Sequence, residues 1–452
     1  MKRQLITVIA GAVLLAGLLC LYKFMPKLPK AADAEPPAAP SAPAYPVVAL
    51  FDRDESALER VTLVNKNGEF NLTPFEEGGG ISWSIEEAGE APLPLNASLV
   101  GDTARVMKRL SMQKASENPE AGYDYGFEGA EGAEAKALFK DGEVKTLKIG
   151  RKTITGEEYY ANLSGDPAVY LMNSYDGDKL FYGWNDFADK SLPSVDSQNL
   201  DYIYVGTPGA ELEAAREDGE LVMKKPWEGL RFNSADFSQA INFAGAQLGD
   251  LVELNAGDLG KYGFDGGYSK IILRDPERAL NLAVGASDGE GNFYVKIGVN
   301  DNVFKMEEDF LAGLPRLEPF KYVDTFVAPV VIDDVSEIDF GAPSRAGTRV
   351  RLSPAEVDGK AADEAELKAW ARKLADIRAE APLPAGAAVS DEPALAVSYT
   401  TKGGEITTEY KEYEGQGGAE FYAVKIAGRG ADWFVVSRET VDEILAAAPK
   451  PK

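Results

Sequence analysis

The sequence contains no histidine, and its only cysteine is Cys20. Without histidine the chain lacks the usual general base, the usual activator of a serine or cysteine nucleophile, and the commonest zinc ligand. A catalytic triad that depends on histidine is therefore excluded. Because Cys20 lies in an apolar leader, the folded part can form neither an internal disulfide nor a thiolate metal site.

Positive charge is also scarce. The chain has 47 basic and 73 acidic residues, with a formal net charge of −26. The first thirty residues contain no acid, so the remainder is more acidic still, and it would repel phosphate backbones and anionic lipid headgroups. Nucleic acid is therefore not expected as a partner. The acidic surface is interpreted as a solvated face, with recruitment of a basic partner as the alternative.

The clearest signal is an uncharged apolar run from Leu5 to Tyr22. This length is about the minimum that spans the roughly 30 Å hydrocarbon layer as a helix. Residues 1–30 are therefore predicted to be an uncleaved signal anchor. A cleaved signal peptide is less favoured because bulky Tyr22, Phe24 and Met25 occupy the region where cleavage needs small residues. A lipoprotein anchor at Cys20 is also less favoured, because it requires a small residue at the position occupied by Leu19.

The anchor predicts a single-pass protein of the cell membrane. Basic residues flank the apolar run on both sides, so charge alone does not fix its orientation. We expect the amino terminus inside and the bulk of the chain extracytoplasmic, which is the common arrangement for an early signal anchor. Residues 31–46 are rich in proline and alanine and predict an extended, semi-rigid linker.

Residues beyond the linker predict an α+β fold of three repeated units, mostly antiparallel β-hairpins with one main helix each. The predicted boundaries are 47–194, 195–326 and a degenerate third unit at 327–452. Hairpin turns are expected at Asn67-Gly68, Asp141-Gly142 and Gly403-Gly404. Helices are expected after an N-cap at Asn96, from Ser234, and around Leu367 and Trp370.

One short motif occurs twice, as "DYGFEG" in the first unit and "KYGFDG" in the second. Its shared residues are Tyr125, Gly126 and Phe127, and Tyr262, Gly263 and Phe264. Glycine permits a turn that a side chain would strain, and the flanking aromatics can pack over adjoining strands. The motif is therefore interpreted as a structural corner, with a binding site as the alternative.

The third unit lacks this motif and carries Ser390-Asp391-Glu392-Pro393 near its place. A pair of aromatics nevertheless begins the last hairpin in all three units. These pairs are Tyr159-Tyr160, Phe293-Tyr294 and Phe421-Tyr422. The third unit is thus expected to be a degenerate repeat of the other two.

The strand "VTLVNKNGEFNL", the "YGF" bend, "KDGEVKTLKIG" and "YYANLSGDPAVYLM" together resemble the DUF4340 family. The resemblance covers residues 60–192, continues through the bend and last hairpin of the second unit, and is loose in the third. Members of this family have no assigned chemistry, typically carry one amino-terminal helix, and in some cases are encoded beside ABC-2-type exporters. The resemblance therefore implies a role outside the membrane beside an ABC-type transporter. It supplies no catalytic residue.

Two loops offer oxygen ligands that calcium could use, one with Asp176 and Asp178 and one spanning 300–302. Neither has the spacing of a calcium loop with a closing bidentate glutamate, so both are interpreted as turns. No metal site and no cofactor is predicted.

A carboxylate-dependent hydrolase would need two converging acids, one with a raised pKa, and the sequence cannot select such a pair. Tryptophans could stack on sugars, although tryptophan in strands more often belongs to the core; the candidates are Trp83, Trp184, Trp227 and Trp433. The expected function is therefore a non-enzymatic, membrane-anchored, extracytoplasmic scaffold or interaction protein. Its expected partners are ABC transporter components or other envelope proteins. A glycan- or peptide-binding protein and a carboxylate hydrolase are the alternatives.

Overall fold

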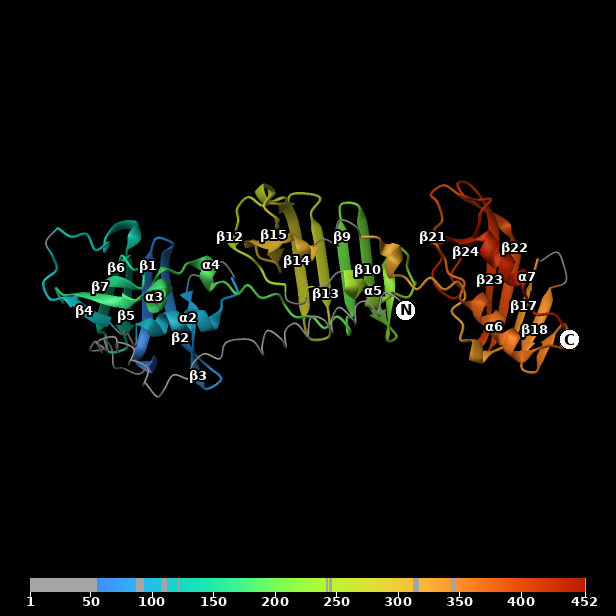
Figure 1. Ribbon diagram of the computed structural model, residues 1–452, viewed down its shortest axis with the longest axis horizontal. Coiled ribbons are helices and arrows are strands. Elements are labelled where there is room, and N and C mark those ends of the chain that lie inside the picture. The colour runs from blue at the N-terminus through green and yellow to red at the C-terminus, as the bar shows by residue number, and fades with distance from the viewer. Residues whose placement is uncertain are drawn as a thin grey trace, which may run out of the picture. The chain divides into compact units, whose positions relative to one another are not determined.

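The computed structural model describes residues 55–86, 93–107, 112–120, 122–240, 243, 246–311, 317–342 and 347–451. The predicted anchor (1–30) and linker (31–46) lie outside the described residues. Within the described ranges, no helix is both long and apolar enough to cross a membrane. The strands form three antiparallel sheets (Figure 1).

The first sheet has eight strands in the order β3-β2-β1-β5-β6-β7-β8-β4, and every neighbouring pair is antiparallel. Strand β1 lies between β2 and β5, so it pairs with the next strand in the chain on one side and with a strand that comes much later on the other. The strands are β1 (Leu58–Asn65), β2 (Gly68–Glu77), β3 (Gly80–Ile85), β4 (Met112–Ser116), β5 (Ala133–Phe139), β6 (Val144–Lys152), β7 (Glu158–Leu163) and β8 (Val169–Asn173).

The second sheet repeats this topology strand for strand, in the order β11-β10-β9-β13-β14-β15-β16-β12. Its strands are β9 (Tyr202–Thr207), β10 (Ala210–Glu217), β11 (Glu220–Lys225), β12 (Leu251–Glu253), β13 (Ser269–Arg274), β14 (Ala279–Ser287), β15 (Asn292–Ile297) and β16 (Val303–Glu307).

The third sheet has the same order with one additional edge strand, β20-β19-β18-β17-β22-β23-β24-β25-β21. Its strands are β17 (Val335–Gly341), β18 (Thr348–Leu352), β19 (Ala355–Val357), β20 (Lys360–Ala361), β21 (Ala381–Pro382), β22 (Ala388–Thr401), β23 (Gly404–Glu414), β24 (Phe421–Val424) and β25 (Phe434–Ser437). Three antiparallel sheets of one topology fit the three predicted units. The boundaries proposed for them stay predictions.

One main helix follows the third strand of the first two units and the extra edge strand of the third. These helices are α2 (Ala97–Val106), α5 (Ser234–Ala240) and α6 (Glu364–Ala375). Each begins after a side chain that accepts backbone N–H bonds: Asn96 from Leu99, Asn233 from Ala235 and Asp236, and Asp363 from Ala365 and Glu366. Asn96 is thus the N-cap predicted from the sequence.

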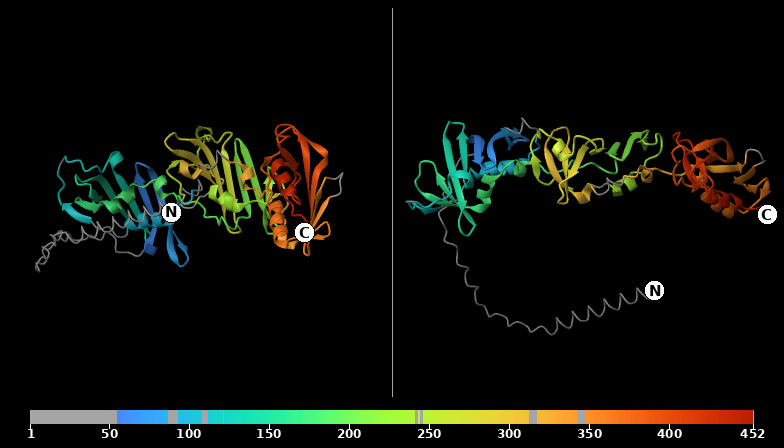
Figure 2. Two further views of the ribbon diagram at one scale, coloured as in Figure 1. Left: turned by 45° about the vertical axis from the view of Figure 1, so that its right-hand side comes forward. Right: turned by 90° about the horizontal axis from the view of Figure 1, so that it is seen from above.

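Further helices follow the last strands of the first and third units: α3 (Ser174–Gly177), α4 (Trp184–Phe187) and α7 (Arg438–Ala446). The 3-10 turns are η1 (Glu55–Ala57), η3 (Gly129–Glu131), η4 (Asp178–Phe181), η5 (Gly260–Tyr262), η6 (Glu308–Leu311), η8 (Pro319–Tyr322) and η9 (Ile332–Asp334). In the third unit α6 and α7 contact each other and lie on one side of the strands (Figure 2).

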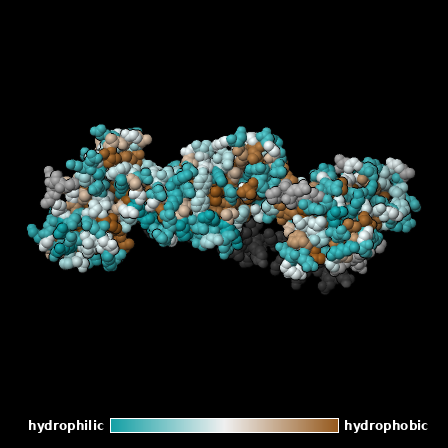
Figure 3. Space-filling model, turned by 180° about the vertical axis from the view of Figure 1, so that it is seen from behind, coloured by the Kyte–Doolittle hydropathy of each residue, from teal (hydrophilic) through white to brown (hydrophobic). Residues whose placement is uncertain are grey.

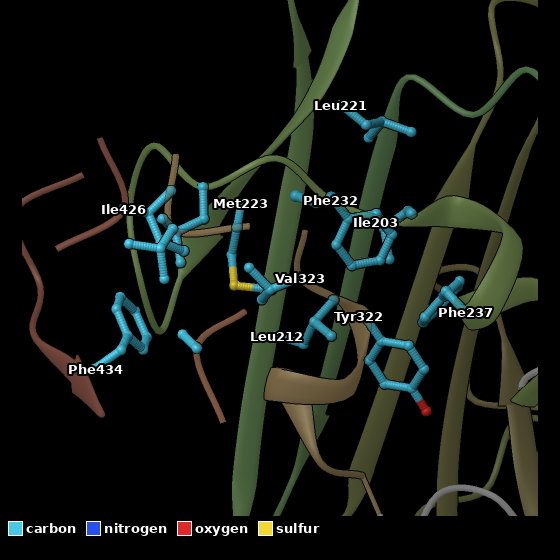
Figure 4. Close-up of a cluster of buried hydrophobic side chains, with 14 of the residues drawn as sticks. Ile203, Leu212, Leu221, Met223, Phe232, Phe237, Tyr322, Val323, Ile426 and Phe434 are labelled. Carbon is cyan, nitrogen blue, oxygen red and sulfur yellow. The ribbon is translucent and has the colours of Figure 1, made fainter. Parts of the chain in front are cut away.

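Strands bury alternate residues, as a sheet with one face on a core requires. In β5 the residues Ala133, Ala135, Ala137 and Phe139 are buried. One cluster of buried side chains includes residues of both the second and the third unit. In Figure 4, Met223 of β11 lies between Val323 and the pair Ile426 and Phe434 of the third unit. The second and third units therefore share apolar packing.

The visible surface fits the acidic composition. Figure 3 shows a face on which hydrophilic residues predominate and hydrophobic residues are scattered in small groups. Such a surface is expected for a chain with a formal net charge of −26.

Candidate functional site

The glycines of the two Tyr-Gly-Phe bends adopt the same left-handed conformation, although a 3-10 turn, η5 (Gly260–Tyr262), precedes only Gly263. Gly126 has φ +76° and Gly263 has φ +80°, so both lie in the left-handed region that favours glycine. A Cβ at Gly126 would lie 2.7 Å from the backbone nitrogen of Arg151, and a Cβ at Gly263 would lie 2.7 Å from that of Ala286. Both bends therefore require glycine for its conformation and for its small size.

Each bend docks at the same place on its sheet. Arg151 follows Gly150 in β6, and Ala286 follows Gly285 in β14. In both strands the pairing register shifts at these residues, which marks a β-bulge. The Arg151 amide donates a 3.0 Å hydrogen bond to the Tyr125 carbonyl, so the bulge supplies a backbone group that the regular ladder does not use.

The aromatic residues of the bends also make matching contacts. The Tyr125 ring meets Tyr160 edge-on at 5.1 Å, and the Tyr262 ring meets Tyr294 edge-on at 4.9 Å. Tyr262 is 2% exposed and its hydroxyl donates to Glu253. Packing against the protein's own strands accounts for the aromatic positions. The structural role stays a prediction, which glycine substitutions can test.

The third unit has no room for such a bend. Residues 383–387 alone connect β21 to β22, whereas 117–132 and 254–268 make the corresponding connections in the other units. Strand β22 is extended instead, and Pro393 pairs with Lys411 of β23. The segment Ser390–Pro393, noted in the sequence, thus lies in an extended strand.

The aromatic pair of the third unit is shifted by one residue. Val424 pairs with buried Phe434, as Val295 pairs with buried Phe304, so Val424 corresponds to Val295. Ala423 therefore stands where the second unit has Tyr294. The alignment of Phe421-Tyr422 with Phe293-Tyr294, taken from the sequence, is one residue out of register. The tyrosine that packs on the bend is absent from the unit that lacks the bend.

An open pocket of about 810 Å³ adjoins this part of the third unit. Its lining combines apolar Pro382, Tyr413 and Phe421 with the glycine-rich loop 415–418. The Tyr413 hydroxyl donates to the Gln416 carbonyl at 3.0 Å, so part of the lining is bonded within the unit.

Both carboxylates of the first calcium candidate loop already have partners, and Asp176 lies 3.4 Å from the Lys179 ammonium. Asp178 accepts a 2.6 Å hydrogen bond from the Tyr159 hydroxyl and lies 2.9 Å from the Lys152 ammonium. Burial, followed by the hydrogen bond to Asp178, raises the pKa of Tyr159 well above its ordinary value. The loop is held together by a tyrosine and a lysine.

The second candidate loop is bonded in a similar way. Asp301 forms a 2.5 Å ion pair with Lys296, and the Asn302 side-chain oxygen accepts from the Asn255 amide at 2.9 Å. Among the described residues, no group of three or more acidic, histidine or cysteine side chains is placed to hold a metal ion.

The described carboxyl groups with a resolved pKa shift all shift downward: Asp166, Asp178, Glu220, Asp250, Glu253, Asp275 and Asp288. Asp288 is an example. A hydrogen-bonded ion pair with Lys305 at 2.8 Å, followed by a bond from Asn292, lowers its pKa. A glycosidase acid needs a raised pKa, so none of these seven has the property expected of that residue.

The tryptophans considered for sugar stacking pack within the protein. Trp83 is 1% exposed and its indole N–H donates to Glu55. Trp184 and Trp227 meet phenylalanine rings edge-on at 5.1 and 5.8 Å. Trp433 is half-buried, with the Lys425 ammonium 4.8 Å from its ring centroid. These contacts are those of core and strand packing.

The connections between units are built twice in one pattern, which we call the first and second joints. In the first joint, Leu95 bridges to Ala188 and the Asp189 amide donates to the Pro94 carbonyl at 2.8 Å. The chain then runs on, and Ser191 bridges to Gln247, just beyond α5. Residues 188–191, the exit segment of the first unit, thus pair with Pro94 and Leu95 before α2 and with Gln247 beyond α5.

The second joint repeats each of these pairings. Phe232 bridges to Val323, the Asp324 amide donates to the Arg231 carbonyl at 2.9 Å, and Phe326 bridges to Arg378. Arg378 lies just beyond α6, as Gln247 lies beyond α5. These pairings therefore align the residues of the first joint one by one with those of the second.

Each joint contains a pocket. The first has a volume of about 400 Å³ and the second about 600 Å³. Both are lined by the N-cap residue of the main helix and by the exit segment that passes it. Sequence reasoning missed these pockets because each joint depends on single bridges between distant residues. The one available signal was the repeated position of Asn96 and Asn233 before a helix.

Comparison with known proteins gives a family and no activity. Residues 83–242 and 238–398 match the family described as "Domain of unknown function (DUF4340)". No curated protein and no solved structure matches the chain. The first match begins in β3 and ends just past α5, and the second begins in α5 and ends in β22. Each match therefore runs from one sheet into the next.

Proposed function

The chain belongs to the DUF4340 family, and we propose that it is a membrane-anchored, extracytoplasmic scaffold that binds other proteins without catalysing a reaction. The observation that carries this proposal is the repeated construction of the molecule. One sheet topology occurs three times, and one joint with a pocket occurs twice. Repeated units commonly present extended binding surfaces whose specificity depends on the residues that differ between repeats.

The proposed location depends on the apolar run from Leu5 to Tyr22, which is long enough to cross a bilayer as a helix. The proline-rich residues 31–46 would hold the sheets away from the membrane. The family resemblance favours a component of an ABC-type transporter as the partner, with other envelope proteins as the wider class. The acidic surface favours a partner with a basic face.

Photo-crosslinking of the full chain in cells tests the scaffold. A photoreactive residue is placed at Val331 or, in a separate variant, at Ile154, because both side chains are strongly exposed. We expect light-dependent enrichment of the same transporter or envelope protein in the membrane fraction, identified by mass spectrometry. A matched chain without residues 1–30 should lose this enrichment. Enrichment of no envelope protein from either site would reject the proposal.

Binding of a small glycan or peptide is the second candidate. The observation that favours it is the pocket of the second joint, whose volume lies in the range of about 300–1,000 Å³ that is usual for small-molecule sites.

A further inference from the structure

The pocket of the second joint is lined by three basic residues, Arg231, Lys321 and Arg378. All three are exposed. The acidic residues of the lining are Asp236 and Asp324. This lining therefore has more basic than acidic residues in a chain whose formal net charge is −26.

The first joint shows whether a joint can form without basic residues at these three positions. Its equivalents of Arg231, Lys321 and Arg378 are neutral or acidic. Pro94 precedes the bridging residue Leu95 as Arg231 precedes Phe232, and Gln247 bridges to Ser191 as Arg378 bridges to Phe326. Asp186 lies two residues before the bridging Ala188, as Lys321 lies two residues before Val323.

The same backbone pairings thus form with proline, aspartate and glutamine at these three positions. The basic residues of the second joint are not needed to build it. An anionic ligand would account for their presence.

Arg378 is held in a way that suits ligand binding. Its guanidinium carbon lies 3.9 Å from the centroid of the Phe326 ring, and the first joint has Ser191 in place of Phe326. Within the described part of the chain, no carboxylate lies within ion-pair distance of Arg378. A guanidinium stacked on a ring through its face keeps the N–H groups at its edge available for hydrogen bonds.

Arg231 is only weakly paired. Its nitrogens lie 3.8 Å from a Glu220 oxygen and 4.0 Å from an Asp324 oxygen. Glu220 forms a shorter contact, 3.0 Å, with Arg429. Both ion pairs of Arg231 are therefore too long for good hydrogen bonds, and its side chain retains donors for another acceptor.

We propose that the pocket of the second joint binds a carboxylate-bearing ligand. Arg378 donates from its planar edge to both carboxylate oxygens, and Arg231 adds positive charge around the same site, whereas the Lys321 ammonium already lies 3.0 Å from a Glu318 carboxylate oxygen. A planar guanidinium matches a carboxylate in a bidentate geometry that a lysine does not reproduce. The carboxylate can belong to the C-terminus of a peptide or to an acidic sugar, since both present the same group.

Calorimetric titration of the full chain in detergent tests this site separately from the scaffold, which crosslinking in cells tests. The probes are acetyl-trialanine, its C-terminal amide, glucuronate and inorganic phosphate, each at low salt. We expect saturable binding of at least one carboxylate probe and none of the amide. Binding of the peptide alone or of glucuronate alone identifies the source of the carboxylate.

Substitutions then locate the site. Arg378→Gln should weaken the bound carboxylate probe about 10- to 100-fold, the range for a hydrogen bond to a charged group. Arg378→Lys should restore only part of the affinity because it keeps the charge without the planar fork. Arg372→Gln, an exposed arginine of α6 outside the pocket, should bind as the unchanged protein does.

Two results would overturn the proposal. The first is no saturable binding of either carboxylate, and binding of phosphate with Arg378 dependence in that case would reject the carboxylate class. The second is equal affinity in the unchanged protein and Arg378→Gln.

Discussion

Substitution of Gly263 by alanine tests whether the Tyr-Gly-Phe bend is a packed corner. Two effects oppose an alanine there. A non-glycine residue in the left-handed region costs about 1–2 kcal/mol. The new Cβ would also lie 2.7 Å from the Ala286 nitrogen and 2.9 Å from the Ala286 Cβ, and forcing a group into a packed site costs about 1–3 kcal/mol.

Gly267 provides the matched control in the same connection. Its φ is +73°, close to the +80° of Gly263, but an added Cβ would meet only the Pro208 side chain at 4.0 Å. Gly267→Ala should therefore show the conformational cost alone, about 1–2 kcal/mol. Gly263→Ala should cost about 2–5 kcal/mol, which adds the packing cost.

Hydrogen exchange measured by mass spectrometry is the suitable assay, because a chain of three units need not unfold in one step. The free energy of opening is compared for amides of β14, where the bend docks. A difference between the two variants of less than about 0.5 kcal/mol, within the usual scatter of surface substitutions, would refute the docking argument. Unchanged opening in Gly263→Ala together with loss of ligand binding would favour a binding role for the motif.

Three further predictions concern the cap, the core and the pH dependence. Asp363→Ala should lower the free energy of unfolding by about 1 kcal/mol because α6 loses its N-cap, whereas Asp363→Asn should be nearly neutral; equal thermal unfolding of the two variants would contradict this. Phe434→Ala should lower the free energy of unfolding by about 3–5 kcal/mol. Because the Phe434 ring contacts Trp227 and Phe320, hydrogen exchange should speed up in the β10–β11 hairpin as well as in β25. An effect confined to the third unit would be the contrary result. The lowered pKa of Asp288 implies a contribution to stability that is complete above about pH 4 and is lost as the pH falls toward the folded-state pKa. The difference in urea midpoint between the unchanged protein and Asp288→Asn should therefore shrink between pH 7 and pH 2. A constant difference would be inconsistent with the Lys305 ion pair.

Local features of the fold were accessible from the sequence. The N-cap at Asn96 depends on a contact three residues away, and the hairpin between β1 and β2 turns at residues 66 and 67, one residue before the predicted Asn67-Gly68. Both signals lie within a few residues of the structure they determine. The repetition of three units was also visible, because it multiplies the same local signals.

The joints were not accessible for the opposite reason. Leu95 pairs with Ala188, and Phe326 pairs with Arg378, across long stretches of chain. Single bridges leave no periodic pattern of apolar residues, so nothing marks these partners in the sequence. Nothing in the sequence singles out Arg378 and Arg231, which the structure places in one pocket.

The register of the third unit shows a similar limit. The pairs Phe293-Tyr294 and Phe421-Tyr422 look alike as letters, but strand pairing aligns Val295 with Val424. A one-residue shift exchanges the two faces of a strand. Sequence similarity over two residues could not reveal which face each aromatic occupies.

The central place of β1 between β2 and β5 has a practical consequence for cutting the gene. A fragment bounded by the family match at 83 and 242 would keep β5 and discard the neighbour that shares its backbone ladder. The same fragment would carry β9 without β13. The stretch that the family model matches and the stretch that completes its own sheet are thus offset along the chain, so a fragment should contain whole sheets.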